Sequence, residues 1–404
     1  MELKKSERLK SVNYAIRGPV YNAAYELEKA GQKILKLNIG NPAQFGIDTS
    51  DVIKNAIIKH INEAQGYCHS QGLIEAREAI KRYNTAKGIK EVSEDDIYIG
   101  NGASELITMS LQVLINPGDE VLVPAPDYPL WTASVNLASG NPVHYICDEK
   151  AGWNPDINDL RKKVTKKTKA LVLINPNNPT GSVYKKEIIE EIIEICRQNN
   201  LVLFSDEIYD RVVYDNKEHI SPAALADDIL IINFNGLSKV FRACGFRLGW
   251  MILNGNKRGA SDFIDGLKVL SSMRLCSNVL AQVGLKAAID LDDSIKALVE
   301  PGGRLREQRD MAWKLLNDIP GVSCVKAEGA LYMFPKIDVN KFGIKNDVKF
   351  ILDLLNDKKV LFVEGTGFNW KEPDHFRIVF LPGVKDLEYA ITQLKDFLAV
   401  YKQT

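Results

Sequence analysis

Two hydrophobic patterns alternate along the chain between about residues 50 and 290. Short apolar, β-branched runs are typical of strands buried on both faces, whereas apolar residues recurring every three or four positions are typical of helices packed on a core. Strands are predicted at 97–99, within 120–131, at 142–148, at 170–174, within 201–210 and at 228–234, and helices at 74–84, 103–114, 156–163 and 188–196. This alternation predicts an α/β fold whose large domain holds a doubly wound, mainly parallel sheet of at least six strands.

The pattern changes after the Pro-Gly-Gly break at 301–303. Predicted helices at 304–317, 348–356 and 385–402 enclose several short strands, which indicates a smaller α+β domain. The first 40 residues form a polar arm with too few apolar positions for a core, so we expect the arm to pack with the C-terminal segment. The predicted division is an N-terminal arm that is part of the small domain (1–48), a large domain (49–295) and a small C-terminal domain (296–404).

Composition and charge narrow the class of protein. The chain has 404 residues, is 45% hydrophobic, and carries 52 acidic and 52 basic side chains, so its balance favours neither nucleic acid nor an anionic membrane as partner. No apolar run reaches the length of a membrane span. The six cysteines are scattered without metal-ligand spacing, so we predict no metal site and reduced thiols in a cytoplasmic protein.

Functional groups follow several of the predicted strands. Lys239 comes just after the strand at 228–234, with Arg247 eight residues later, and Asp206 ends an apolar strand with Tyr209 three residues on. Open α/β sheets bind ligands at the carboxyl ends of their strands, and a carboxylate there needs a cation. Taken singly, Lys239 could be a solvated surface lysine and Asp206 a structural acid.

The turn Gly100-Asn101-Gly102 joins a strand to a helix and leaves the first helical amides free for an anion. Its spacing differs from the dinucleotide fingerprint, so we discount a dinucleotide fold. The predicted groups together suit a phosphorylated aromatic aldehyde with a basic ring nitrogen. They are a phosphate site, a strand-end lysine, a buried acid and the amide of Asn178.

The ordered motifs carry a resemblance to a known family. The chain reads LNIGNP (37–42), NPNNPTG (175–181), DEIYD (206–210), GLSK (236–239), GFRLGW (245–250) and HFRIVFLP (375–382). In this order and spacing they resemble the fold-type I pyridoxal-phosphate-dependent aminotransferases, and they cover nearly the whole chain.

The resemblance implies a role for each matching residue. Lys239 is expected to hold pyridoxal 5′-phosphate as a Schiff base and to move the substrate proton, Asp206 to keep the ring nitrogen protonated, and Tyr209 to bond the phenolic oxygen. The remaining cofactor contacts implied are Asn178 at the same oxygen, Arg247, Ala103, Ser104 and Ser238 at the phosphate, Tyr128 on the ring, and Tyr67 at the phosphate bound by a neighbouring subunit. The last contact implies a homodimer.

Substrate-binding residues follow from the same resemblance. Arg377 matches the arginine that grips the α-carboxylate as a fork, with Gly40 and Asn178 beside it. Met273, with Arg274 next to it, stands where aspartate-specific members have an arginine. The arm motif YAIRGPV, which contains Tyr14 and Arg17, is similar to alanine aminotransferases.

We therefore expect L-alanine and 2-oxoglutarate to give pyruvate and L-glutamate, with Arg17 meeting the distal carboxylate of glutamate. Three alternatives remain open: an aminotransferase of broader or aromatic/valine-type specificity, a carbon–sulfur β-lyase on the same fold, and a non-catalytic cofactor-binding sensor. The sensor is normally joined to a DNA-binding segment, for which the ten polar residues before the arm leave no room.

Overall fold

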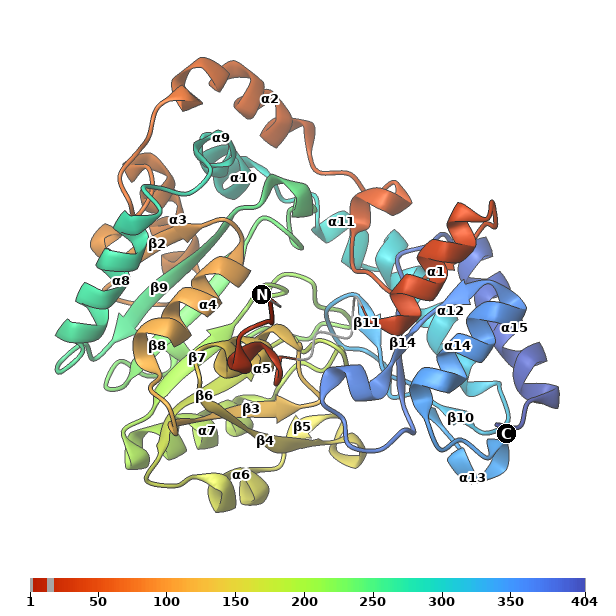
Figure 1. Cartoon of the computed structure of the whole chain (residues 1–404). Coiled ribbons are helices and arrows are strands. Elements are labelled where there is room, and N and C mark those ends of the chain that lie inside the picture. Colours follow the sequence, from red (N-terminus) through yellow and green to blue (C-terminus); the bar gives the residue numbers. More distant parts are fainter. Residues whose placement is uncertain (1–2, 13–17, 404) are drawn as a thin grey trace.

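The computed structural model describes residues 3–12 and 18–403 and contains a large central sheet. The eight strands of that sheet in the described chain are, in spatial order, β2 (Ile97–Gly100), β9 (Gly249–Gly255), β8 (Leu230–Gly236), β7 (Val202–Asp206), β6 (Thr168–Ile174), β3 (Glu120–Ala125), β4 (Asn141–Asp148) and β5 (Asn154–Pro155). Helices surround this sheet, and a second group of elements lies to one side of it (Figure 1). The α/β fold class is confirmed.

Strand directions refine the prediction of a mainly parallel sheet. Strands β8, β7, β6, β3 and β4 pair in parallel, whereas β9 runs antiparallel to both β8 and β2, and β5 runs antiparallel to β4. The direction reverses at β9 because the connection from β8 holds no crossover helix of the kind that parallel neighbours need. This connection carries Lys239 and Arg247.

Each face of the sheet has its own apolar core. Val172 of β6 packs with the cluster under α4, α5 and α8, while Leu171 and Leu173 point to the opposite cluster. Such alternation is the two-residue period of a strand covered on both sides. The helices around this sheet are α2 (Asp51–Lys59), α3 (Ile74–Ala86), α4 (Ala103–Leu114), α5 (Leu130–Leu137), α6 (Ile157–Lys163), α7 (Lys186–Asn199), α8 (Ser261–Met273), α9 (Val279–Gln282) and α10 (Leu285–Leu291).

The C-terminal elements form a smaller α+β group together with the N-terminal arm. Its helices are α1 (Pro19–Lys29), α11 (Lys296–Val299), α12 (Arg304–Asn317), α13 (Val339–Phe342), α14 (Asp347–Lys358) and α15 (Val384–Val400), and its strands are β1 (Leu35–Lys36), β10 (Val322–Ser323), β11 (Tyr332–Met333), β12 (Lys336–Ile337), β13 (Val360–Leu361), β14 (Val363–Glu364) and β15 (Phe376–Val379). Strand β1 pairs in parallel with β13, and the red α1 lies against the blue C-terminal helices (Figure 1). The boundaries at 48 and 295 stay a proposal that agrees with this pairing.

Some features are missing from the part of the chain that the structure describes. None of its helices is long and apolar enough to cross a membrane. Within the same residues, no three His, Cys, Asp or Glu side chains are placed to share a metal ion. All six cysteines are free thiols.

Candidate active site

A cavity of about 270 Å³ opens at the carboxyl ends of the parallel strands. Ile174, Asp206 and Phe234 lie next to one another in register, so the residues that follow them meet at one edge of the sheet. The predicted site residues that line this cavity are Gly40, Ala103, Ser104, Tyr128, Asn178, Asp206, Tyr209, Ser238, Lys239, Arg247 and Arg377.

Lys239 is partly buried, three residues beyond the end of β8. Its Nζ donates a 2.6 Å hydrogen bond to the carbonyl of Gly40, which comes from the N-terminal arm. Burial acts to lower the pKa of Lys239, but Tyr332 and Cys244 outweigh it, so the net pKa lies above that of an ordinary lysine. The amine is thus held as a donor at the centre of the predicted chemistry.

Asp206 is a buried carboxylate that meets neutral donors from two directions. Trp131 Nε1 donates to its Oδ2 at 3.1 Å, and the backbone N–H of Ile208 donates to its Oδ1 at 3.3 Å. Burial raises the pKa of Asp206 to about 6. Because no Lys, Arg or His in residues 3–12 and 18–403 forms an ion pair with it, this acid fits the protonated ring nitrogen of pyridoxal phosphate.

The turn before α4 forms a cradle that suits a phosphate. Gly102 (φ +85°) is the N-cap of α4 and leaves the first amides of the helix without a side-chain cap. A Cβ at Gly102 would overlap the Arg247 guanidinium, and Arg247 Nη2 lies 3.5 Å from Ser104 Oγ. Backbone amides, a hydroxyl and a guanidinium are the donors that bind phosphate, so these residues fit the phosphate of the cofactor.

Arg377 lies buried on β15 between two aromatic rings. Its Cζ stands 4.5 Å from the centre of the Tyr332 ring and 4.6 Å from that of Phe368. Its Nη1 donates to Asn178 Oδ1 at 3.1 Å, and its Nη2 donates to the carbonyl of Asn38. The guanidinium is thereby fixed with Asn178 beside it, as a fork for a carboxylate requires.

Sequence reasoning missed Tyr332, which links the two sides of the cavity. The Tyr332 and Tyr209 hydroxyls lie 2.7 Å apart, and a Cβ at Gly40 would overlap the Tyr332 hydroxyl. The only signal is one tyrosine in the sequence GALYMFP, in a segment predicted as a strand. Other missed residues of the lining and its surroundings are Asn38, Trp131 and Cys244.

Among the remaining predicted residues that the structure describes, Tyr67, Met273 and Arg274 do not line this cavity. Tyr67 is 81% exposed, and Tyr14 and Arg17 lie outside the described residues. Met273 is 75% exposed at the end of α8. Arg274 Nη2 donates to the carbonyls of Ile99 and Ser70, and its Nε lies 3.6 Å from Glu105 Oε2.

Comparisons with known proteins agree with this arrangement. The family described as "Aminotransferase class I and II" matches residues 32–394. The glutamate-pyruvate aminotransferase AlaA of Escherichia coli K12 is 57% identical over 401 residues, which is 99% of each chain. A crystal structure of an aminotransferase from Escherichia coli superposes with a TM-score of 0.99 at 56% identity over 100% of both chains. An alanine aminotransferase from Pyrococcus furiosus gives a TM-score of 0.93 at 42% identity over 98% of this chain and 100% of the other.

The chain belongs to the class I and II aminotransferase family. Its cofactor is pyridoxal phosphate, in agreement with the buried acid, the strand-end lysine and the open helix N-terminus that line the cavity.

Proposed function

We propose that this protein transfers the amino group between L-alanine and 2-oxoglutarate, giving pyruvate and L-glutamate in two half-reactions. The observation that carries this proposal is the full-length identity of 57% to a glutamate-pyruvate aminotransferase, in a chain whose cavity holds the predicted lysine, aspartate and arginine. The similarity to an alanine aminotransferase from Pyrococcus furiosus supports alanine as one of the substrates.

Each residue of the cavity has a role in this reaction. Pyridoxal phosphate, when bound, supplies an aldehyde for the amino group and a ring that draws electrons from the α-carbon. Lys239 anchors the cofactor and carries the α-proton on its Nζ, and Asp206 holds the proton on the ring nitrogen. Tyr209 and Asn178 bond the phenolic oxygen, while Tyr128 packs on the ring.

Substrate orientation depends on the opposite wall. Arg377 binds the α-carboxylate that all amino-acid substrates share, and Gly40 allows the backbone to come close. A bound carboxylate replaces water around the guanidinium and sets which bond of the α-carbon lies over Lys239. This shared contact cannot separate alanine from glutamate.

A donor panel tests the function. Purified protein loaded with pyridoxal phosphate is incubated with 2-oxoglutarate and each of a set of amino acids, and the 2-oxo acid and glutamate formed are measured. Alanine should give pyruvate and glutamate in equal amounts. Pyruvate with ammonia from a cysteine-type donor would instead favour the carbon–sulfur β-lyase, and preference for aromatic donors or valine would favour the broader aminotransferase.

The distal carboxylate of glutamate needs a cation of its own, and we assign Arg17 to it. The assignment rests on the likeness of the arm motif to alanine aminotransferases, and the described part of the arm contacts α5. Asn136 of α5 donates to the carbonyl of Ser11 at 3.0 Å, and α5 begins at Leu130, which lines the cavity. On the other side, α1 begins at Pro19.

An Arg17→Ala variant should raise the KM for glutamate and 2-oxoglutarate by roughly tenfold or more, if the ion pair contributes ~1.5–3 kcal/mol. The KM for alanine and pyruvate should change much less, because a methyl group has no charge to lose. Steady-state kinetics of both substrate pairs measure the difference, with Arg8→Ala as an arm-charge control. If the KM values of both substrate pairs rise by the same factor, the arm acts only as a lid.

The phosphate cradle can be tested at Gly102. A Gly102→Ala variant should bind pyridoxal phosphate at least about tenfold more weakly, because the new methyl displaces Arg247 from a charge-assisted contact. Fluorescence titration of the apo-protein measures the affinity. Gly118 shares the positive φ (+92°) but has nothing within 4 Å, so Gly118→Ala should lower the melting temperature without changing the affinity. If the two variants bind pyridoxal phosphate with equal affinity, the turn at Gly102 does not bind the phosphate as proposed.

We further propose that the protein is a cytoplasmic homodimer. Tyr67, Met273 and Leu275 are exposed by 81%, 75% and 53%, and Met273 borders a hollow that reaches Ser104 of the cradle. A second copy covering this surface would bring its own Tyr67 to the phosphate site. Molar mass in solution tests the dimer.

Free thiols at all six cysteines suit a reducing compartment.

A further inference from the structure

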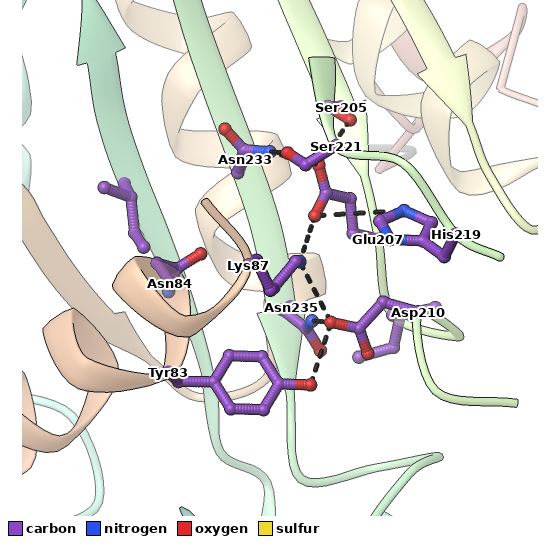
Figure 2. Close-up of polar contacts among 12 residues, drawn as sticks. Tyr83, Asn84, Lys87, Ser205, Glu207, Asp210, His219, Ser221, Asn233 and Asn235 are labelled. Atoms are coloured by element: carbon purple, nitrogen blue, oxygen red, sulfur yellow. Dashed lines mark hydrogen bonds and ion pairs between the residues drawn. The ribbon is translucent and has the colours of Figure 1, made fainter. Parts of the chain in front are cut away.

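Figure 2 shows a buried charged cluster around Lys87, Glu207 and Asp210. The two acids are the sequence neighbours of Asp206 and Tyr209, which line the cavity. Lys87, which follows the C-terminal end of α3, donates to Glu207 and, at 3.0 Å, to Asp210 Oδ2. The side chain of Lys87 is 18% exposed and those of both acids are 1% exposed. The transamination chemistry derived above uses none of these three groups.

The cluster and the cavity share one turn of the chain. Asp210 N–H donates to the carbonyl of Glu207, so residues three apart lie on the same side of this turn. Asp206 and Tyr209 line the cavity, whereas Glu207 and Asp210 point back to Lys87. Any movement of the two acids therefore turns Asp206 and Tyr209 as well.

Further bonds connect the cluster to the neighbouring strands. Ser205 and Ser221 hydroxyls donate to Glu207 Oε1 at 3.0 and 2.6 Å. Asn235 Nδ2 donates to Asp210 Oδ2 at 2.8 Å, and Asn235 Oδ1 accepts from the N–H of Gly236, three residues before Lys239. Asp210 thus connects the turn to the end of the strand that precedes Lys239.

Lys87 is the critical residue of the cluster because it carries the positive charge that faces both acids. Burial alone would raise the pKa of Glu207, but Lys87, with further contributions from His219 and the Ser221 hydroxyl, outweighs burial, so the net pKa is lowered and the acid is charged. Without Lys87, two buried carboxylates would face each other with no cation between them, and an uncompensated buried charge is strongly destabilising. The nearby His219 cannot replace it, because burial lowers the pKa of that imidazole.

We propose that Lys87 is a positioning residue for the reaction: by holding Glu207 and Asp210 together it fixes the turn that presents Asp206 and Tyr209 to the cofactor. This inference rests on the proposed function, since it assigns these two residues to the ring nitrogen and the phenolic oxygen. Lys87 itself borders a separate cleft of about 710 Å³ on the far side of the turn, and it does not line the cavity.

The test compares Lys87→Met with Lys87→Arg, which keeps the positive charge, and with Lys81→Met. Lys81 lies within α3, which ends just before Lys87, and pairs with Glu94 at 3.0 Å, but its side chain is 40% exposed. For each variant we measure the affinity of the apo-protein for pyridoxal phosphate, the pH midpoint of the visible absorption of the bound cofactor, and kcat. A double variant, Lys87→Met with Glu207→Gln, removes one charge of each sign and covers the case in which Lys87→Met does not fold.

Lys87→Met, or the double variant in its place, should lower kcat by about 10- to 100-fold, shift the absorption midpoint and weaken cofactor binding, because a small misplacement of reacting groups is costly. Lys87→Arg should recover most of each loss, and Lys81→Met should behave like the wild type. If the folded variant keeps the wild-type kcat, absorption midpoint and affinity for pyridoxal phosphate, and only its melting temperature falls, the role of the cluster is purely structural. A wild-type protein without transaminase activity would instead overturn the proposed function itself.

Discussion

Replacing Lys239 with alanine should abolish the covalent attachment of pyridoxal phosphate and lower the transamination rate by roughly 10²- to 10⁴-fold from proton transfer alone. The physical reason is that Lys239 is the lysine that lines the cavity, where its Nζ is held by the carbonyl of Gly40. Reduction with borohydride followed by mass spectrometry locates the cofactor on the chain, and steady-state kinetics give the rate.

The matched control is Lys169→Ala. Lys169 lies at the opposite end of the same sheet, in β6, and its side chain is 46% exposed. This variant should keep the adduct and the rate of the wild type. Recovery of the reduced adduct at another lysine in the Lys239→Ala protein would show that the attachment site is wrongly assigned.

The second large effect is expected at Asp206. An Asp206→Asn variant should lose several powers of ten in kcat/KM, since the ring nitrogen would no longer stay protonated and each ~1.4 kcal/mol added to the barrier costs tenfold. Kinetics with alanine and 2-oxoglutarate measure the loss. Asp347→Asn is the control, because Asp347 is also buried with a raised pKa but accepts from Thr366 and does not line the cavity. Near-normal turnover of Asp206→Asn would make Asp206 a structural acid.

The raised pKa of Asp206 adds a pH signature to the same variant. In the folded apo-protein this acid binds its proton up to a pH of about 6, whereas the ordinary carboxyl titrates near 3.8. The apo-protein therefore loses stability from this group as the pH rises from about 4 to about 6. A cationic ring nitrogen removes that loss, so the cofactor should raise the melting temperature more above pH 6 than below pH 4. Asp206→Asn should reduce the difference.

The local sequence was sufficient to predict which residues stand at the strand ends, but it was not sufficient to predict the residues that contact them. Asp206 ends one strand that apolar composition identifies and Lys239 follows another by five residues, and parallel strand ends converge. Trp131, in contrast, reaches Asp206 only because it lies in the first turn of α5, whereas the sequence places it in a Pro-rich turn. Nothing local indicates that Tyr332 meets Tyr209, which is 123 residues earlier.

The reversal at β9 has a similar cause. The segment 228–234 reads as a buried strand, and its parallel place beside β7 follows from the alternation of strands and helices. The direction of β9 depends on the form of the connection after β8, which passes through Lys239 and Arg247 with one short 3-10 helix (Cys244–Phe246) and no crossover α-helix. The same connection brings Gly249 so close to the first amide of α4 that no side chain fits there. The sequence alone does not predict this close approach, because it depends on how the strands pair.

The pairing of β1 with β13 governs when the cavity can be completed during synthesis. Leu35 and Lys36 leave the ribosome early, but their partners Val360 and Leu361 follow about 320 residues later, on the order of half a minute at typical translation rates. Gly40 and Asn38, which contact Lys239 and Arg377, stand just beyond β1. A nascent chain can thus build the large sheet while its arm has no strand to join, and Asn38 and Gly40 reach their places beside Arg377 and Lys239 only after Val360 and Leu361 have been made.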